Sequence, residues 1–180
     1  MSDRPITAPA LTVADAAALW DVAPGFLDCA SYGPPPRPAW QALQRSLDEW
    51  RAGTGPWTPW AATVQASREA FAAMVGIGAD HVTTGAAVSQ LLAPIAAAVP
   101  DGATVLVPDI EFTSGVFPFA VHADRTVAVR TAPLADLADA IDTGTFLVSF
   151  SAVQSATGEV TDIPAITARA REVGAVTVLD

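Results

Sequence analysis

Short, continuous apolar runs alternate with helical patterns after Gly76, and this order constrains the fold more than any other feature of the sequence. The apolar runs lie at residues 81–84, 103–107, 126–130, 146–150 and 175–179. Helical patterns cover residues 87–99, 134–141 and 164–172. Unbroken runs of Val, Leu, Ile and Phe are typical of strands buried on both faces, and strands that alternate with helices form a mostly parallel sheet. We therefore predict an α/β domain with a doubly wound sheet.

The sequence up to Gly76 does not show this alternation of apolar runs and helical patterns. We predict an N-terminal helical segment with long loops over residues 1–76. Thr12 and Asp15 have the spacing of a capping box, in which two side chains satisfy the first free amide groups of a helix. This pair predicts a short helix that carries Leu19 and Trp20.

Two longer helices are predicted to follow in this segment. From Pro38 onward, four large apolar residues recur at helical spacing and should share one face. They are Trp40, Leu43, Leu47 and Trp50. Thr58 and Pro59 suit the first positions of a third helix, which Gly76 should end. Its inward-facing residues should be Val64, Phe71, Met74 and Val75.

Composition excludes several classes of function. The 180 residues carry a formal charge of −10, and all nine basic residues are arginines, so no basic stripe exists that could follow a nucleic-acid backbone. One cysteine and two histidines make a metal site improbable. No apolar run has the roughly 18 residues of a membrane helix, and the start has no signal-peptide pattern. We expect a cytoplasmic protein that binds neither nucleic acid nor membrane.

The order of strands and helices predicts where a ligand would bind. In open parallel sheets, ligands bind at the carboxyl ends of the strands. These ends are predicted near residues 84–87, 108–112, 151–155 and 180.

The first of these ends, Thr84-Gly85-Ala86-Ala87-Val88-Ser89, passes through glycine into a helix. Gly85 allows a tight turn, and the amide groups of Ala86 and Ala87 could point at an anion together with the helix dipole. An ordinary turn between strand and helix is the alternative interpretation.

The other three ends each offer one candidate side chain. Phe112 could stack on a flat ring or be a core hydrophobe. Gln154 could donate to a ligand's phenolic oxygen, or belong to a turn with local hydrogen bonds. Asp180 could pair with a protonated ring nitrogen, or be a solvated end of the chain.

These segments together resemble a known family. The order runs from Phe26-Leu27-Asp28 with Gly33-Pro34 through TGAAVS, EFTS and VQSATGEV to GAVTVLD. It is similar to the class V aminotransferase and cysteine desulfurase family of pyridoxal 5′-phosphate (PLP) enzymes, over about residues 26–180. The resemblance implies PLP-dependent transferase fold type I, with residues 77–180 as a partial large domain.

The resemblance also implies a cofactor and the residues that hold it. The backbone amides of Gly85, Ala86 and Ala87 would bind the phosphate of PLP. The segment at Ala30 and Ser31 would line the substrate side.

Three side chains would hold the ring of the cofactor. Phe112 would stack on it, Gln154 would approach its phenolic oxygen, and Asp180 would keep its nitrogen protonated. Relatives often have a threonine hydroxyl in the phosphate loop, where this chain has alanines.

The family implies transamination, C–S or C–Se bond cleavage, or epimerisation of an amino-acid-like substrate, in a homodimer. The sequence has no lysine, so the family's Schiff-base lysine is missing and no catalytic residue is assigned. We expect these residues to be the N-terminal portion of a longer enzyme, truncated at 180. The alternative is a non-catalytic binding or interaction module that keeps the scaffold.

Overall fold

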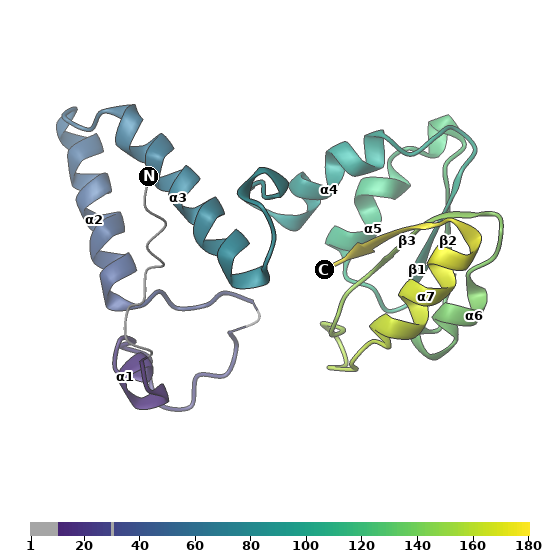
Figure 1. The fold of residues 1–180 in the computed structure, drawn as a ribbon, viewed down its shortest axis with the longest axis horizontal. Helices are drawn as coiled ribbons and strands as arrows, with labels where there is room; N and C mark the ends of the chain where they lie inside the picture. The colour runs from purple at the N-terminus through teal and green to yellow at the C-terminus, as the bar shows by residue number, and fades with distance from the viewer. Residues whose placement is uncertain (1–10, 30) are drawn as a thin grey trace. The chain divides into compact units, whose positions relative to one another are not determined.

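The chain folds into two compact units, residues 1–67 and 68–180, in a computed structural model that describes residues 11–29 and 31–180 (Figure 1). The boundary between the units falls inside helix α3 (Trp57–Val75). The first unit also contains helices α1 (Val13–Ala17) and α2 (Arg37–Ala52).

The capping box predicted for α1 is confirmed. Asp15 N–H donates to Thr12 Oγ1 at 3.1 Å, and Thr12 N–H donates to Asp15 Oδ2 at 3.3 Å. The helix is shorter than predicted, because it ends at Ala17 and leaves Leu19 and Trp20 beyond it. Trp20 Nε1 instead donates to the carbonyl oxygen of Pro34 at 2.8 Å.

The predicted inward face of α3 is wrong for the described chain. Val64, Phe71, Met74 and Val75 are 46–74% exposed. A helix buries an apolar face only where another element packs against it, and the described residues leave this face open. The predicted end is correct, since Gly76 has φ +75° and Ile77 N–H donates to the Ala72 carbonyl oxygen at 3.0 Å.

The second unit is built around a four-stranded sheet in which all neighbouring strands are parallel, as predicted. The strand order is β2-β1-β3-β4. The strands are β1 (Thr104–Pro108), β2 (Ala128–Ala132), β3 (Thr145–Phe150) and β4 (Val176–Leu179). Leu106 pairs with Arg130 on one side and with Val148 on the other, which fixes the register of β2, β1 and β3.

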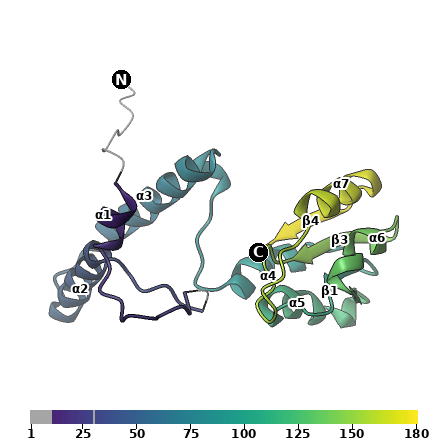
Figure 2. The ribbon, with the colours of Figure 1, turned by 90° about the horizontal axis from the view of Figure 1, so that it is seen from below.

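Helices cover both faces of this sheet, and Figure 2 shows α5 and α7 on opposite sides of it. One core contains Leu92 and Ala96 of α4 (Val88–Ala97) and Phe119 of α5 (Thr113–Ala120), packed with Val105 and Leu147 of the sheet. The other core contains the buried residues of α6 (Leu137–Ala140) and α7 (Ile163–Val173), packed against the opposite face of the sheet. Short 3₁₀ helices are η1 (Ala79–His81), η2 (Ala123–Arg125) and η3 (Leu134–Asp136).

Residues 81–84 do not form the predicted strand. His81 is the last residue of η1, and the carbonyl oxygen of Val82 accepts a hydrogen bond from Arg68 Nε at 2.7 Å. A strand forms where a neighbouring strand completes its hydrogen bonds, and no described residue pairs with this run in the sheet. Helix α5 was not predicted, because Gly115 and Pro118 lie within it and both residues disfavour the interior of a helix.

Candidate functional site

The chain reverses direction across the sheet between β1 and β3. From β1 it moves outward to β2 through α5 on one face, and it then returns past β1 to β3 and continues through α7 on the other face. The loops that follow β1 and β3 therefore leave toward opposite faces. Open α/β sheets bind their ligands at the carboxyl ends of the strands beside such a reversal.

Glu111 joins the two loops at this reversal. Its carboxylate accepts hydrogen bonds from Ser151 N–H at 2.9 Å, from Ser151 Oγ at 2.5 Å and from Gln154 Nε2 at 3.1 Å. The N–H of Phe112 donates to the same carboxylate at 3.0 Å. Four donors on one acceptor-only group give a rigid polar cluster, which we name the Glu111 cluster: Glu111, Ser151 and Gln154.

Gln154 is the most deeply buried member of this cluster, with 1% of its surface exposed. A carboxylate can only accept hydrogen bonds, so the nitrogen of the Gln154 amide must face Glu111. Its Oε1 is the one buried side-chain nitrogen or oxygen without a hydrogen-bond partner in the described part of the chain. An unpaired buried acceptor is costly, so this oxygen requires a donor such as a water molecule or a ligand.

Phe112 and Asp180 lie on either side of this cluster along the sheet edge. Phe112 is the N-cap of α5 and is 54% exposed, so it is not the core hydrophobe of the alternative interpretation. Asp180 follows β4, and its carbonyl oxygen accepts a hydrogen bond from Ala152 N–H at 2.7 Å. Its N–H donates to the Phe150 carbonyl oxygen at 3.0 Å, so backbone pairing carries Asp180 to the loop of Gln154.

The Gly85, Ala86 and Ala87 segment leads into α4 as predicted, although no strand precedes it. Ala87 is the N-cap of α4 and supplies no side-chain hydrogen bond to the first turn. The N–H of Ala86 is already used, because it donates to Gln90 Oε1 at 2.9 Å. A phosphate at this position would therefore have to replace Gln90 at the Ala86 amide or use the neighbouring amides.

The proposed substrate segment is only partly described. Ala30 lies outside the described residues. Ser31 is exposed, and its Oγ donates to Asp28 Oδ1 at 2.6 Å. Ser31 belongs to the first unit, whereas the Glu111 cluster belongs to the second.

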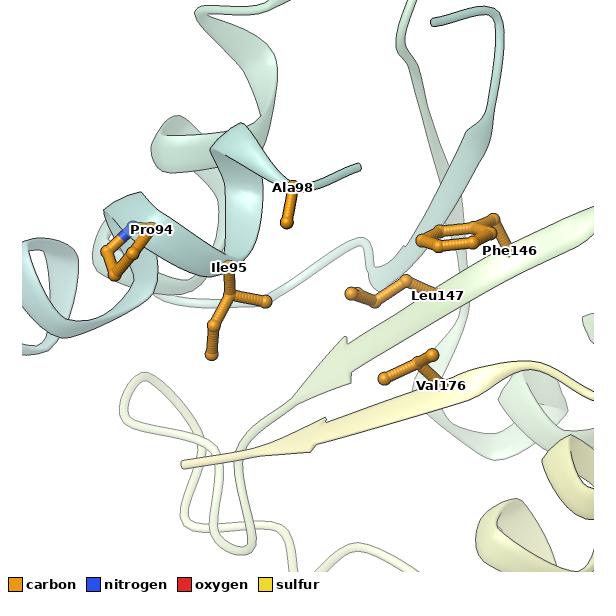
Figure 3. Close-up of a pocket in the computed structure, with 6 residues that line it drawn as sticks. All are labelled: Pro94, Ile95, Ala98, Phe146, Leu147 and Val176. Carbon is orange, nitrogen blue, oxygen red and sulfur yellow. The ribbon is translucent and has the colours of Figure 1, made fainter. Parts of the chain in front are cut away.

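An apolar hollow of the second unit lies away from this edge (Figure 3). It has a volume of about 390 Å³ and is formed by α4, β3 and β4. Its lining residues are Pro94, Ile95, Ala98, Phe146, Leu147 and Val176. Phe146 and Val176 stand near the starts of their strands, so the hollow faces the amino half of the sheet and carries no group for chemistry.

Sequence reasoning missed the role of Glu111 and Ser151. The sequence offered one signal, a carboxylate three residues after a buried strand and next to Phe112. Thr161 was also missed; it is buried, and its Oγ1 donates to the Ser151 carbonyl oxygen at 2.6 Å. Its contact joins positions ten residues apart and has no local sequence pattern.

Two features are absent from the part of the chain that the structure describes. No helix there is both long and apolar enough to span a bilayer. Within the same residues, His, Cys, Asp and Glu side chains form no group of three or more that could hold a metal ion.

Comparison with known proteins assigns the family. The family model described as "Aminotransferase class-V" matches residues 51–180, which include every element of the sheet and the Glu111 cluster. The chain belongs to the class V aminotransferase family. This confirms the resemblance read from the motifs between Phe26 and Asp180.

The most informative relatives are cysteine desulfurases and a related lyase. A probable cysteine desulfurase of Methanothermobacter thermautotrophicus is 29% identical over an alignment of 170 positions, which covers 86% of this chain and 42% of that protein. The solved structure of the cysteine desulfurase CsdA from Escherichia coli aligns with a TM-score of 0.71 at 15% identity, covering 95% of this chain and 49% of CsdA. A C-DES variant with glycine covalently linked to its PLP cofactor aligns with a TM-score of 0.67 at 19% identity, covering 82% of this chain and 43% of C-DES.

These alignments confirm the predicted fold, a partial large domain of fold type I. They also show that the chain spans less than half the length of each of these relatives.

Proposed function

We propose that this chain forms the front part of a PLP-dependent enzyme that acts on an amino-acid-like substrate. The reaction would be transamination, cleavage of a C–S or C–Se bond, or epimerisation. The proposal rests on the Glu111 cluster, in which a carboxylate holds the buried Gln154 amide at the reversal of the sheet and leaves its second N–H for an acceptor such as the phenolic oxygen of PLP.

The residues at this edge fit the non-covalent part of a PLP site. The half-exposed ring of Phe112 offers a stacking surface, the Asp180 carboxylate offers a negative charge, and Gln154 offers an amide. The N-terminus of α4 has no side-chain cap from Ala87, which suits an anionic group. Each property is one that the ring or the phosphate of PLP requires.

The chain's own residues would bind and orient the cofactor. Phe112 would cover one face of the ring and exclude water from it. Asp180 would hold a proton on the ring nitrogen by pairing with the positive charge, and Gln154 would fix the edge that carries the phenolic oxygen. Bound PLP supplies an electron sink for bonds broken at the α-carbon or β-carbon of the substrate.

The covalent anchor of the cofactor would come from outside these 180 residues, since none of them is a lysine. The chain spans 42% of the curated desulfurase, which leaves more than half of that relative without a counterpart here. We propose that a further polypeptide segment supplies the lysine, and that the complete enzyme is a cytoplasmic homodimer.

A second candidate function is a binding or interaction module that keeps the scaffold without catalysis. Two observations favour it: the absence of lysine, and the alanines at positions 86 and 87, which provide no hydroxyl to a phosphate. Such a module would be a folded monomer at the length of this chain.

The two candidates are separated by the intact mass of the protein from its natural source after borohydride reduction. Reduction makes the linkage between PLP and a lysine permanent. The enzyme proposal predicts a mass well above 18.5 kDa that includes a reduced PLP adduct. A mass near 18.5 kDa without an adduct would contradict the enzyme proposal and support the module.

A further inference from the structure

We infer that Glu111 is a positioning residue that sets which end of the Gln154 amide is available to a ligand. The inference deepens the proposed function and rests on it for the identity of the ligand. The geometry that carries it is the hydrogen bond from Gln154 Nε2 to Glu111 Oε2 at 3.1 Å, together with the unpaired, buried Oε1 of the same amide.

A glutamine amide can rotate by half a turn with little change in shape, because its oxygen and nitrogen are similar in size. Opposite a carboxylate, however, the two orientations differ greatly in energy. One places an N–H donor against the carboxylate, and the other places two acceptor oxygens against each other. Glu111 therefore selects the orientation in which Oε1 and the second N–H of Gln154 remain for other partners.

Hydrogen-bond donors from the loops after β1 and after β3 fix the position of Glu111. Ser151 holds it through its N–H and its hydroxyl on the β3 side, and Phe112 N–H holds it on the β1 side. Half of the Glu111 hydrogen bonds thus come from backbone groups, whose positions the sheet and α5 determine. The orientation of the Gln154 amide therefore depends on the loops after β1 and β3, which would both contact the ligand.

The test compares Glu111→Gln with the wild-type chain. A glutamine at position 111 can accept hydrogen bonds from Ser151, but it can also donate. Both orientations of the Gln154 amide can then form a hydrogen bond with residue 111, so their energy difference becomes small. The two side-chain amide protons of Gln154 report the orientation of the amide in NMR spectra. The proton that is hydrogen-bonded to the carboxylate resonates downfield of the proton that is not. We expect the two resonances to be well separated in the wild type and to shift and broaden in Glu111→Gln.

The matched control is Glu159→Gln, which removes a carboxylate charge from the β3–α7 loop, the loop that carries Gln154. The Glu159 side chain accepts from Thr157 Oγ1 at 2.9 Å and has no described contact with the Gln154 side chain. It should leave the Gln154 resonances in place. If Glu111→Gln does not fold, Glu111→Asp serves instead, since it keeps the charge but withdraws the carboxylate by one methylene and should cause the same loss of separation.

The same variants are titrated with 4-deoxypyridoxine 5′-phosphate, a PLP analogue that lacks the aldehyde and needs no lysine. We expect Glu111→Gln to bind the analogue at least about tenfold more weakly than Glu159→Gln does. The loss of one hydrogen bond to a charged group changes a dissociation constant by about this factor. Gln154 resonances that stay unchanged in folded Glu111 variants would overturn the inference. Shifted resonances without any binding of the analogue by the wild type would uphold the positioning role and contradict the proposed function.

Discussion

Leu91 lies directly against Gly85 at the entrance to helix α4. A Cβ added to Gly85 would lie 2.6 Å from Leu91 Cδ2 and 2.8 Å from Leu91 Cγ. Both distances are far below van der Waals contact. The glycine is therefore required by close approach of a side chain, and the predicted phosphate segment has its shape because Leu91 fills the space beside it.

Gly85→Ala should destabilise the chain by about 1–3 kcal/mol, since overpacking forces side chains and backbone to shift. Urea unfolding followed by circular dichroism measures the change. The double variant Gly85→Ala/Leu91→Ala should recover part of the loss, because the second substitution removes the clash. Gly33→Ala is the control, as no atom lies within 4 Å of the added Cβ; an equal loss there would contradict the steric explanation.

Arg125 of η2 caps the C-terminal end of α4. Its guanidinium donates to the carbonyl oxygens of Ala97 at 3.1 Å and Val99 at 2.5 Å, and it forms an ion pair with Asp101 at 2.7 Å. Arg125→Gln should lower the free energy of unfolding by about 1.5–3 kcal/mol, because two carbonyl groups lose a charged donor.

Asp101→Asn separates the ion pair from the capping of the helix. The Asp101 side chain is 74% exposed, and exposed ion pairs contribute about 0–1 kcal/mol. Its effect on denaturant unfolding should therefore be smaller than that of Arg125→Gln. Equal effects of the two variants would mean that the ion pair, and not the carbonyl groups, carries the stabilisation.

Asp142 connects β2 to the turn before β3. The hydrogen bond from Arg130 and that from Gly144 N–H hold the pKa of its carboxyl below the ordinary value of 3.8. A pKa lowered in the folded state adds stability above pH 3.8, and this stability is lost as the pH falls through the lower, folded-state pKa.

Arg130→Gln should raise the pKa of Asp142 toward its ordinary value, because the largest cause of the shift is removed. Carboxyl ¹³C NMR during an acid titration measures it directly. Arg171→Gln removes the same charge from α7, where no described contact joins it to Asp142, and should leave that titration unchanged. A titration of Asp142 that does not respond to Arg130→Gln would refute this assignment.

The central strands β1 and β3 were predictable from sequence because they are largely buried and read as unbroken apolar runs. The edge strands β2 and β4 also formed, but most of their residues are exposed, contrary to the prediction of burial on both faces. The four runs that formed strands include Val105, Leu106 and Val148, all with no measurable exposure. The fifth run, at residues 81–84, has the same local pattern but no partner among the described residues. Local pattern predicts the tendency to form a strand, whereas pairing depends on what lies next to it.

The candidate site was predictable only in part. Phe112, Gln154 and Asp180 follow strands β1, β3 and β4, so their place at the carboxyl edge follows from chain order. The role of Glu111 could not be predicted, because its partner Gln154 is 43 residues away and the contact depends on β1 and β3 being neighbours. The exposure of α3 was also not predictable, because an apolar face in sequence does not say what covers it.

A titration of the ¹⁵N-labelled chain with 4-deoxypyridoxine 5′-phosphate, followed by ¹H–¹⁵N NMR, tests the position of the cofactor site most directly. We expect saturable binding, with the largest shifts at the amides of Ala87, Phe112, Ser151 and Gln154 and at the Gln154 side chain. No saturable shift, or shifts confined to the hollow between Ile95 and Val176, would contradict the assignment of the cofactor site to the carboxyl edge of the sheet.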